Sequence, residues 1–202
     1  MATERQSPDA ILELTNLTGV LSDIQDDPDS PDVDWLTAAP NVATTVRVSF
    51  PTPTGNPTTG AGVQEFRILL RKTAINGGKT DDTYTVDLYE NGVQKQATIA
   101  SGGNVPTGGV VVSALWDATN LATADGSLVE CYVTTTPEAG GAPTSRGSIE
   151  VGAVEWNVTY DVGGPTPNAY NKIFYTSEPP TPNAWNQVKQ EAGTGWKKLL
   201  YV

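Results

Sequence analysis

The sequence predicts an all-β protein, an antiparallel β-sandwich or jelly roll with an extended N-terminal arm and a C-terminal tail. Apolar and polar residues alternate with a period of two over much of residues 44–160, which is typical of half-buried antiparallel strands. Turns rich in glycine and proline separate roughly eight such segments, the number that a jelly roll needs. No segment has the apolar spacing of a long helix. We therefore expect residues 1–22 to form the arm, residues 23–162 the sandwich and residues 163–202 the tail.

The N-terminal segment favours an extended conformation. Residues 1–22 begin polar and then place isoleucine, leucine and valine among threonine, asparagine and glycine. Ser7-Pro8-Asp9 could begin a short helix, because proline fits the first helical turn. The continuation is rich in β-branched residues and asparagine, so we favour an arm that contains a strand.

An acidic run follows at residues 23–35, and its two prolines forbid regular structure. Closely spaced carboxylates are oxygen ligands that suit Ca²⁺. The candidate ligands are Asp26, Asp27, Asp29 and Asp32. The run lacks the glycine and the distant glutamate of an EF-hand loop, so a solvated acidic loop is the favoured interpretation and a calcium site the alternative. We expect Trp35 to anchor the far end of this loop against the core.

The strands of the sandwich follow in order from residue 44. The first two are indicated by the alternating apolar side chains Val46, Val48 and Phe50, and then Phe66, Ile68 and Leu70. Another strand leads from residue 84 to Asn91-Gly92, and its partner returns over residues 93–99. Asn-Gly readily adopts the positive φ angles of a type I′ turn, so these two strands are expected to form a hairpin.

Three more strands are expected over residues 110–116, 128–134 and 149–160. We assign Trp116 to the core, and Cys131 to an inward position as a small apolar filler, with a reactive thiol as the alternative. In the last strand the inward phase slips by one residue beside Gly152, which predicts a β-bulge. A long bulged strand that bends between two sheets is a feature of sandwiches and jelly rolls.

Charge and hydropathy exclude several classes of partner. Twelve lysines and arginines stand against 23 aspartates and glutamates, a formal charge of −11, so no electropositive surface for nucleic acid is expected. No apolar run approaches the ~20 residues of a membrane helix. Residues 1–8 lack the charged-then-apolar pattern of a signal peptide. We expect a soluble protein that is synthesised in the cytoplasm and has neither nucleic acid nor membrane as a partner.

The sequence carries no recognisable catalytic motif. The chain has no histidine, which removes Ser-His-Asp and Cys-His nucleophiles and most zinc sites. Paired carboxylates could hydrolyse a glycoside, with Glu150 and Glu155, or Asp87 and Glu130, as candidates. Each lies at a predicted outward position, where a carboxylate ordinarily keeps the sheet surface wet. We expect a protein that is not an enzyme and needs no cofactor, apart from the calcium alternative above.

The tail contains one phrase twice. Thr-Pro-Asn-Ala, an aromatic residue and Asn begin at Thr166 and again at Thr181, and each copy leads to an aromatic and aliphatic segment. We expect these side chains to bind a partner or a neighbouring copy, by strand addition or by burial of aromatic anchors. The candidate contacts are Tyr170, Phe174, Tyr175, Trp185, Trp196, Leu199, Leu200 and Tyr201. The alternative is that the rings pack on the chain's own sandwich.

Charge is distributed unevenly between the two ends of the chain. Residues 1–40 carry nine acidic groups and Arg5, whereas residues 165–202 carry two acidic groups and four lysines. The tail is therefore complementary to the head of its own chain or of a neighbour. We therefore expect the tail, residues 165–202, to contact residues 1–40 of its own chain or of a neighbouring copy.

Four stretches of the chain carry a resemblance to known proteins. They are Thr15-Asn16-Leu17-Thr18-Gly19, the aspartate-rich run ending in Trp35-Leu36-Thr37-Ala38, Gln64-Glu65-Phe66-Arg67, and Ala124-Asp125-Gly126-Ser127-Leu128-Val129-Glu130-Cys131. Over roughly residues 15–160 the chain resembles uncharacterised structural proteins of tailed bacteriophages. Such proteins resemble in turn the jelly-roll cement or decoration proteins that sit as trimers on the outer capsid, and also the sandwich domains of phage tails.

The resemblance implies a virion protein, made in the host cytoplasm and placed on the outer capsid surface. Its flanking arms favour a homotrimeric cement protein that bridges neighbouring subunits of the major capsid protein. A tail-associated adhesion module that binds carbohydrate is the alternative, and Tyr89 and Tyr132 are the outward rings that could stack on a sugar. A tail accessory protein is a third interpretation.

Overall fold

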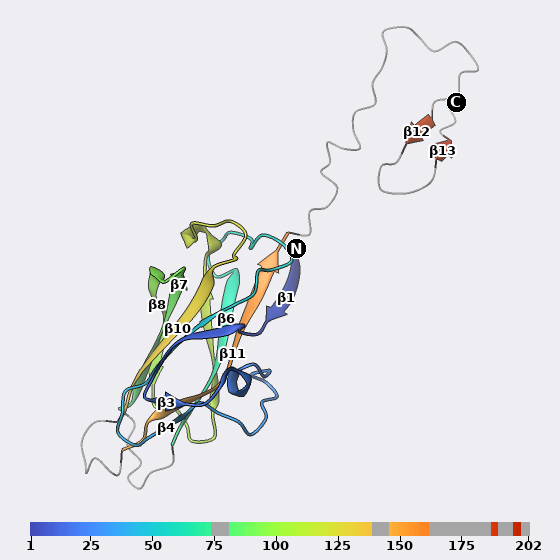
Figure 1. Ribbon diagram of the computed structural model, residues 1–202. Helices are drawn as coiled ribbons and strands as arrows, with labels where there is room; N and C mark the ends of the chain where they lie inside the picture. Colours follow the sequence, from blue (N-terminus) through green and yellow to red (C-terminus); the bar gives the residue numbers. More distant parts are fainter. Residues whose placement is uncertain (74–80, 139–145, 162–186, 190–195, 199–202) are drawn as a thin grey trace, which may run out of the picture. The chain divides into compact units, whose positions relative to one another are not determined.

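The computed structural model describes residues 1–73, 81–138, 146–161, 187–189 and 196–198 (Figure 1). The chain divides into two compact units, Met1–Val162 and Gly163–Val202. Antiparallel sheets form the first unit, and its only helices among the described residues are two short 3₁₀ segments, η1 (Leu21–Ile24) and η2 (Ala118–Asn120). The predicted all-β class is therefore confirmed.

The first unit is a sandwich of a four-stranded and a five-stranded sheet. The four-stranded sheet has the order β1 (Ala2–Gln6), β11 (Ile149–Tyr160), β6 (Gln64–Lys72) and β9 (Val110–Trp116). The five-stranded sheet has the order β2 (Ala10–Thr15), β5 (Thr45–Ser49), β10 (Val129–Thr136), β7 (Thr83–Glu90) and β8 (Val93–Gly103). Two short strands, β3 (Leu17–Thr18) and β4 (Thr37–Ala38), pair beside them. All neighbours within the sheets are antiparallel.

The strand order is that of a jelly roll with one added strand. If β2 is set aside, the remaining strands pair first with last and then inward along the chain: β1 with β11, β5 with β10, β6 with β9 and β7 with β8. This is the pairing of one long hairpin rolled into two facing sheets, which defines the jelly roll. The added strand β2 extends the five-stranded sheet beyond β5.

The predicted N-terminal arm is corrected by the structure, because residues 1–22 belong to the sandwich. Strand β1 pairs with β11, with Arg5 opposite Asn157, and β2 pairs with β5, with Glu13 opposite Arg47. The chain thus supplies an edge strand to each sheet in turn. The strand-forming residues were recognisable in the sequence, but their pairing partners lie far along the chain.

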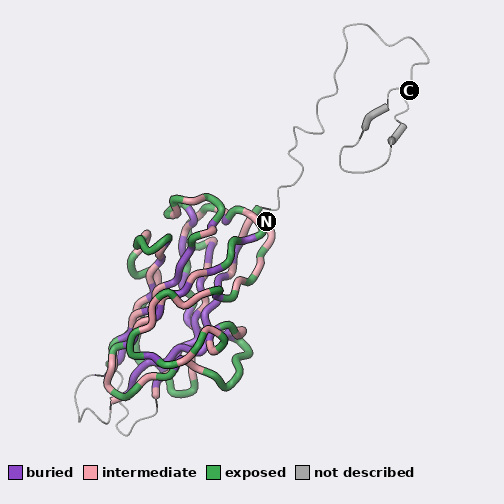
Figure 2. Tube along the Cα trace, viewed as in Figure 1, coloured by how far each residue is buried: buried purple, intermediate pink, exposed green. Residues whose placement is uncertain are grey.

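Four aromatic side chains fill the centre of the core. Phe50 and Phe66 stack with ring centroids 5.5 Å apart, and Trp116 and Trp156 lie 5.6 Å apart. All four rings are at most 2% exposed, and buried residues follow the inner faces of both sheets (Figure 2). The core position predicted for Trp116 is confirmed. Cys131 is also buried, and burial raises the pKa of its thiol, so the inward filler is confirmed over the reactive thiol.

The β-bulge predicted beside Gly152 is confirmed. The register of β11 against β6 shifts between Val151 and Ala153. A Cβ atom on Gly152 would lie 2.6 Å from the indole of Trp35, closer than real contacts allow, so only glycine admits this ring. The guanidinium of Arg71 lies 4.0 Å from the centre of the same indole. Trp35 therefore anchors the acidic loop, but on the outside of the four-stranded sheet and not against the core as expected.

The hairpin predicted at Asn91-Gly92 is also confirmed. It joins β7 to β8, and its two residues have φ angles of 50° and 75°. Positive φ at both central positions is the signature of a type I′ turn. The turn places β8 at the edge of the five-stranded sheet, next to the outward side chains of β7.

The second unit contains one described strand pair, β12 (Gln187–Lys189) with β13 (Trp196–Lys198). Trp196 begins β13, and the other predicted partner contacts lie outside the described residues: Tyr170, Phe174, Tyr175, Trp185, Leu199, Leu200 and Tyr201. Among the residues that the structure describes, no helix has the length and apolar character needed to cross a membrane.

Candidate functional site

Two tyrosines lie together on the outer face of the five-stranded sheet. Tyr89 belongs to β7 and Tyr132 to the adjacent β10, and their ring centroids are 5.2 Å apart with the planes tilted by 60°. Their neighbours Leu88, Cys131 and Val133 are buried in the core, so strand alternation turns both tyrosines outward. The predicted outward direction of both rings is confirmed, and the register makes them neighbours.

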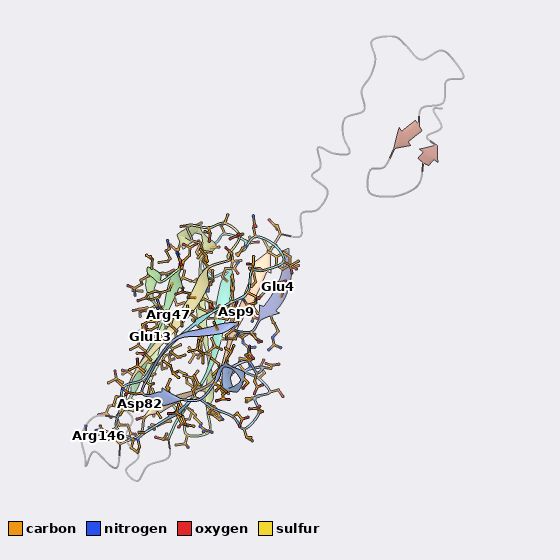
Figure 3. All side chains as sticks on the ribbon, viewed as in Figure 1. Glu4, Asp9, Glu13, Arg47, Asp82 and Arg146 are labelled. Carbon is orange, nitrogen blue, oxygen red and sulfur yellow. The ribbon has the colours of Figure 1, made fainter. Side chains whose placement is uncertain are left out.

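An arginine and a glutamate hold this pair of rings. The guanidinium of Arg47, on β5, lies 5.6 Å from the ring centre of Tyr89, and its Nη1 lies 3.5 Å from Oε2 of Glu130. The hydroxyl of Tyr132 donates a hydrogen bond of 3.2 Å to Oε1 of Glu13. Glu13 and Arg47 are opposite one another on β2 and β5 (Figure 3). The rings are thus positioned by contacts from two residues on neighbouring strands, and Glu130 in turn holds Arg47.

A second carboxylate flanks the rings from the other side. Asp87 precedes Tyr89 by two residues on β7 and lies opposite Tyr132 on β10. Its Oδ1 accepts a hydrogen bond of 2.6 Å from the backbone N–H of Thr98, and its Oδ2 accepts one of 3.0 Å from Nε2 of Gln94. Both donors come from β8. Asp87 is therefore fixed beside the rings while remaining half-exposed.

We call this surface the tyrosine face, and it consists of Glu13, Arg47, Asp87, Tyr89, Glu130 and Tyr132. Burial and the negative charge of Glu13 raise the pKa of Tyr132, so its hydroxyl keeps its proton. The face thus offers apolar rings, a hydroxyl, carboxylate acceptors and one guanidinium. Sequence reasoning missed Glu13 and Arg47, because β2 was placed in an arm and pairs with β5 only in the folded chain.

The carboxylate pairs considered for glycoside hydrolysis are mostly not solvated, which corrects their predicted exposure. Glu130 is 6% exposed, and its Oε1 accepts a hydrogen bond from the backbone N–H of Gly92. Glu150 is 5% exposed, and its Oε2 accepts a hydrogen bond of 2.8 Å from Nε of Arg71. Glu155 is 3% exposed between two arginines. Period-two alternation correctly predicted that these glutamate side chains point outward, but loops and arginines cover the outer face of the sheets where they lie.

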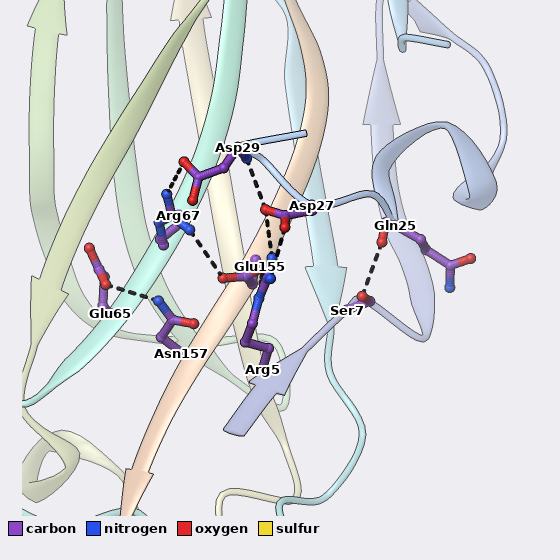
Figure 4. A network of polar contacts seen from close by, with 9 residues as sticks. All are labelled: Arg5, Ser7, Gln25, Asp27, Asp29, Glu65, Arg67, Glu155 and Asn157. Atoms are coloured by element: carbon purple, nitrogen blue, oxygen red, sulfur yellow. Dashed lines mark hydrogen bonds and ion pairs between the residues drawn. The ribbon is translucent and has the colours of Figure 1, made fainter. Parts of the chain in front are cut away.

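The acidic loop is held on the four-stranded sheet by arginines (Figure 4). Arg5 donates a hydrogen bond of 2.9 Å to Asp27 and also contacts Glu155. Arg67 donates one of 2.6 Å to Asp29. The hydrogen bond from Arg5 lowers the pKa of Asp27 to about 2. Two of the four aspartates considered for calcium are therefore ion-paired with residues of β1 and β6.

The calcium interpretation is not supported by this geometry. Of the other two candidate ligands, Asp26 accepts a hydrogen bond of 3.0 Å from the backbone N–H of Asp32. Within the described ranges, no group of three or more acidic or thiol side chains is arranged to hold a metal ion. The predicted solvated loop was also incomplete, because ion pairs from Arg5 and Arg67 hold the loop on the four-stranded sheet. Arg5 and Arg67 are distant in sequence, so the run alone did not reveal these contacts.

Comparison with known proteins identifies no family. No protein family model matches the chain, and no curated protein matches it. A solved structure of CBM35 from Paenibacillus barcinonensis is similar at 13% sequence identity and a TM-score of 0.30. The match covers 74% of this chain and 98% of the CBM35 chain. A likeness this distant does not bear on function, which has to be inferred from the site itself.

Proposed function

We propose that this chain is a non-enzymatic binding module whose tyrosine face binds carbohydrate. The observation that carries the proposal is the pairing of Tyr89 and Tyr132 on the outside of a jelly-roll sheet, 5.2 Å apart and flanked by Glu13 and Asp87. Aromatic rings pack against the apolar faces of sugars, and flanking carboxylates accept hydrogen bonds from sugar hydroxyls. This combination fits a sugar better than it fits a wholly apolar ligand.

The way the rings are held supports a binding role. Arg47 contacts the ring of Tyr89, and Glu13 fixes the hydroxyl of Tyr132, so neither ring must be ordered when a ligand arrives. Sites built on strands and supported by surrounding contacts lose less entropy on binding than sites on loops. From the resemblance of residues 15–160 to phage structural proteins, the proposal extends to a module carried on a virion, where it would serve adhesion to a host glycan.

Alanine at either ring is expected to weaken glycan binding about tenfold or more, the loss typical of a central aromatic contact. The full-length chain would be screened on a glycan array, and the best ligand titrated by calorimetry against Tyr89→Ala and Tyr132→Ala. Leu115→Ala is the matched control, since this side chain is 52% exposed on β9 of the other sheet. Tyr132→Phe keeps the ring and removes only the contact with Glu13. Unchanged affinity in both alanine variants, or no glycan bound at all, would contradict the proposal.

A capsid cement role is the second candidate, favoured by the charge contrast between the two compact units. Residues 1–162 carry 21 acidic and 8 basic residues, a net charge of −13, whereas residues 163–202 carry 2 and 4, a net charge of +2. A basic unit joined to an acidic one is suited to bridging neighbouring copies on the major capsid protein. The homotrimer and the outer capsid location are part of this proposal.

Removal of residues 165–202 tests the cement role. The full-length chain is expected to be a trimer in solution and to decorate virions, whereas the truncated chain should fold as a monomer and fail to decorate them. Light scattering gives the oligomeric state, and cryo-electron microscopy of the particles gives the location. A monomeric full-length chain that is absent from the capsid surface would rule this role out.

A further inference from the structure

A strained residue lies on β8 beside the tyrosine face. Thr98 has a φ angle of 53°, in the left-handed region that β-branched residues rarely adopt. The other non-glycine residues with positive φ in the described part of the chain are all asparagines, which tolerate this region. Strain of this kind persists only where surrounding structure enforces it, and it gathers at ligand sites.

The strained backbone at Thr98 directs its N–H toward the carboxylate of Asp87. The N–H of Thr98 donates its hydrogen bond of 2.6 Å to Oδ1 of Asp87. The register of β8 against β7 shifts between Val86 and Leu88, on either side of Asp87, and again between Leu88 and Tyr89. The edge strand therefore departs from regular pairing at the point where it can hold this side chain. Each carboxylate oxygen has two lone pairs, so Asp87 can still accept hydrogen bonds from a ligand.

The charges of the tyrosine face limit which ligand can bind. Glu13 and Asp87 flank the rings, and Glu130 lies beneath Arg47. Three carboxylates and one guanidinium give the face a formal charge of −2. The guanidinium of Arg47 is already engaged with Glu130 and the ring of Tyr89. An acidic sugar would bring its carboxylate against like charges without a free cation to receive it.

We infer that the tyrosine face selects uncharged hexopyranosyl glycans, with Asp87 as the acceptor of sugar hydroxyls and with uronic and sialic acid residues excluded. This inference rests on the proposed carbohydrate-binding function and names its ligand class. The rings bind the apolar face of the sugar, while Asp87 determines specificity through hydroxyl groups. A site built to accept such hydrogen bonds discriminates more strongly than an apolar surface does.

A matched pair of probes tests the selection: an oligogalacturonate and its carboxyl-reduced, uncharged counterpart of the same length and linkage. Both are titrated against the full-length chain at low ionic strength, where repulsion between charges is least screened. We expect the uncharged probe to bind at least about tenfold more tightly. Asp87→Asn should weaken binding of the uncharged probe about tenfold. Glu13→Gln removes one negative charge, so it should reduce the difference in affinity between the two probes. Leu115→Ala, on β9 of the other sheet, is the control variant and should leave the affinity for both probes unchanged.

The outcomes separate the two claims. Equal or tighter binding of the oligogalacturonate, or wild-type affinity in Asp87→Asn, overturns the inferred selection while leaving carbohydrate binding in place. Failure of both probes together with every glycan on the array overturns the proposed function, and this inference with it. The melting temperature of Asp87→Asn shows whether the variant is folded. A folded variant that binds the uncharged probe more weakly supports Asp87 as the acceptor of sugar hydroxyls, and a folded variant that binds it normally refutes this role.

Discussion

Replacement of Lys72 by methionine is expected to lower the free energy of unfolding by about 3–5 kcal/mol, the cost of breaking a buried ion pair from one side. The ammonium of Lys72 lies 3.2 Å from Oδ1 of Asp82 and 2.7 Å from Oε1 of Glu138. The side chains of these two acids are 0% and 4% exposed. Without the lysine, both carboxylates remain in a poorly solvated end of the sandwich, because the backbone fixes them there.

The pH dependence identifies the mechanism. In the wild-type protein, burial raises the pKa of Glu138, but hydrogen bonds from Gly147 and Lys72 outweigh it and the pKa is lowered. Its stabilising contribution is therefore present above the ordinary pKa of about 4.5 and is lost as the pH falls. In Lys72→Met, Glu138 loses the hydrogen bond and the positive charge of Lys72 that help to lower its pKa, so this pKa should rise and the variant should recover stability relative to wild type as the pH falls from 7.

Urea unfolding of the full-length chain at pH 7 and pH 4.5 measures both effects. Lys95→Met is the matched control, since Lys95 pairs with Glu90 at 2.9 Å but is more exposed, and Glu90 keeps other donors. We expect Lys95→Met to lose about 1 kcal/mol, within the range of partly exposed pairs. A loss below about 1 kcal/mol in Lys72→Met, or a deficit that grows on acidification, would show that Asp82 and Glu138 do not depend on this cation.

The parts of the fold that were predicted correctly are those that depend on neighbouring residues. Alternation identifies strands and the outward direction of Tyr89 and Tyr132, and the phase slip at Gly152 identifies a bulge within a single strand. The Asn91-Gly92 turn is equally local. In each case the conformation follows from φ preferences and from which face of a strand must be apolar. No long-range contact has to be known.

The parts that were missed depend on pairing over long sequence separations. Arg5 contacts Asp27 only because β1 joins β11 at a sheet edge, so the acidic run alone indicated a solvated loop, with a calcium site as the alternative. Glu13 reaches Tyr132 across 119 residues, which requires β2 to extend the sheet beyond β5. Carboxylates at outward positions were expected to be exposed to solvent, but the alternation of apolar and polar residues does not reveal which loop or arginine covers a strand. The candidate site therefore became visible only with the register.

Glu90→Gln is expected to lower the free energy of unfolding by about 2–3 kcal/mol at pH 7, because one carboxylate holds an entire loop. Glu90 is 3% exposed at the end of β7. It accepts hydrogen bonds of 2.8 Å and 2.7 Å from the backbone N–H groups of Ala122 and Thr123, and it pairs with Lys95. A glutamine in this place loses the charge and turns an amide donor toward groups that are themselves donors.

The same carboxylate predicts the acid sensitivity of the wild-type protein. Burial raises the pKa of Glu90, but hydrogen bonds from Thr123 and Lys95 and from the backbone outweigh it and lower the pKa to about 2. A depressed pKa means that the contribution is complete above about 4.5 and lost as the pH falls toward 2. The deficit of Glu90→Gln should therefore be largest at neutral pH and should shrink through this window.

Thermal unfolding between pH 7 and pH 2.5 tests this expectation, and hydrogen exchange at Ala122 and Thr123 reports on the loop itself. Asp125→Asn is the control, because Asp125 is an exposed residue of the same loop that accepts a hydrogen bond only from nearby Ser127. Asp125→Asn should leave the free energy of unfolding close to that of the wild type. If Glu90→Gln and wild type lose stability in parallel on acidification, another carboxylate governs the transition. If exchange at Ala122 and Thr123 is unchanged in Glu90→Gln, the loop is held by contacts other than Glu90.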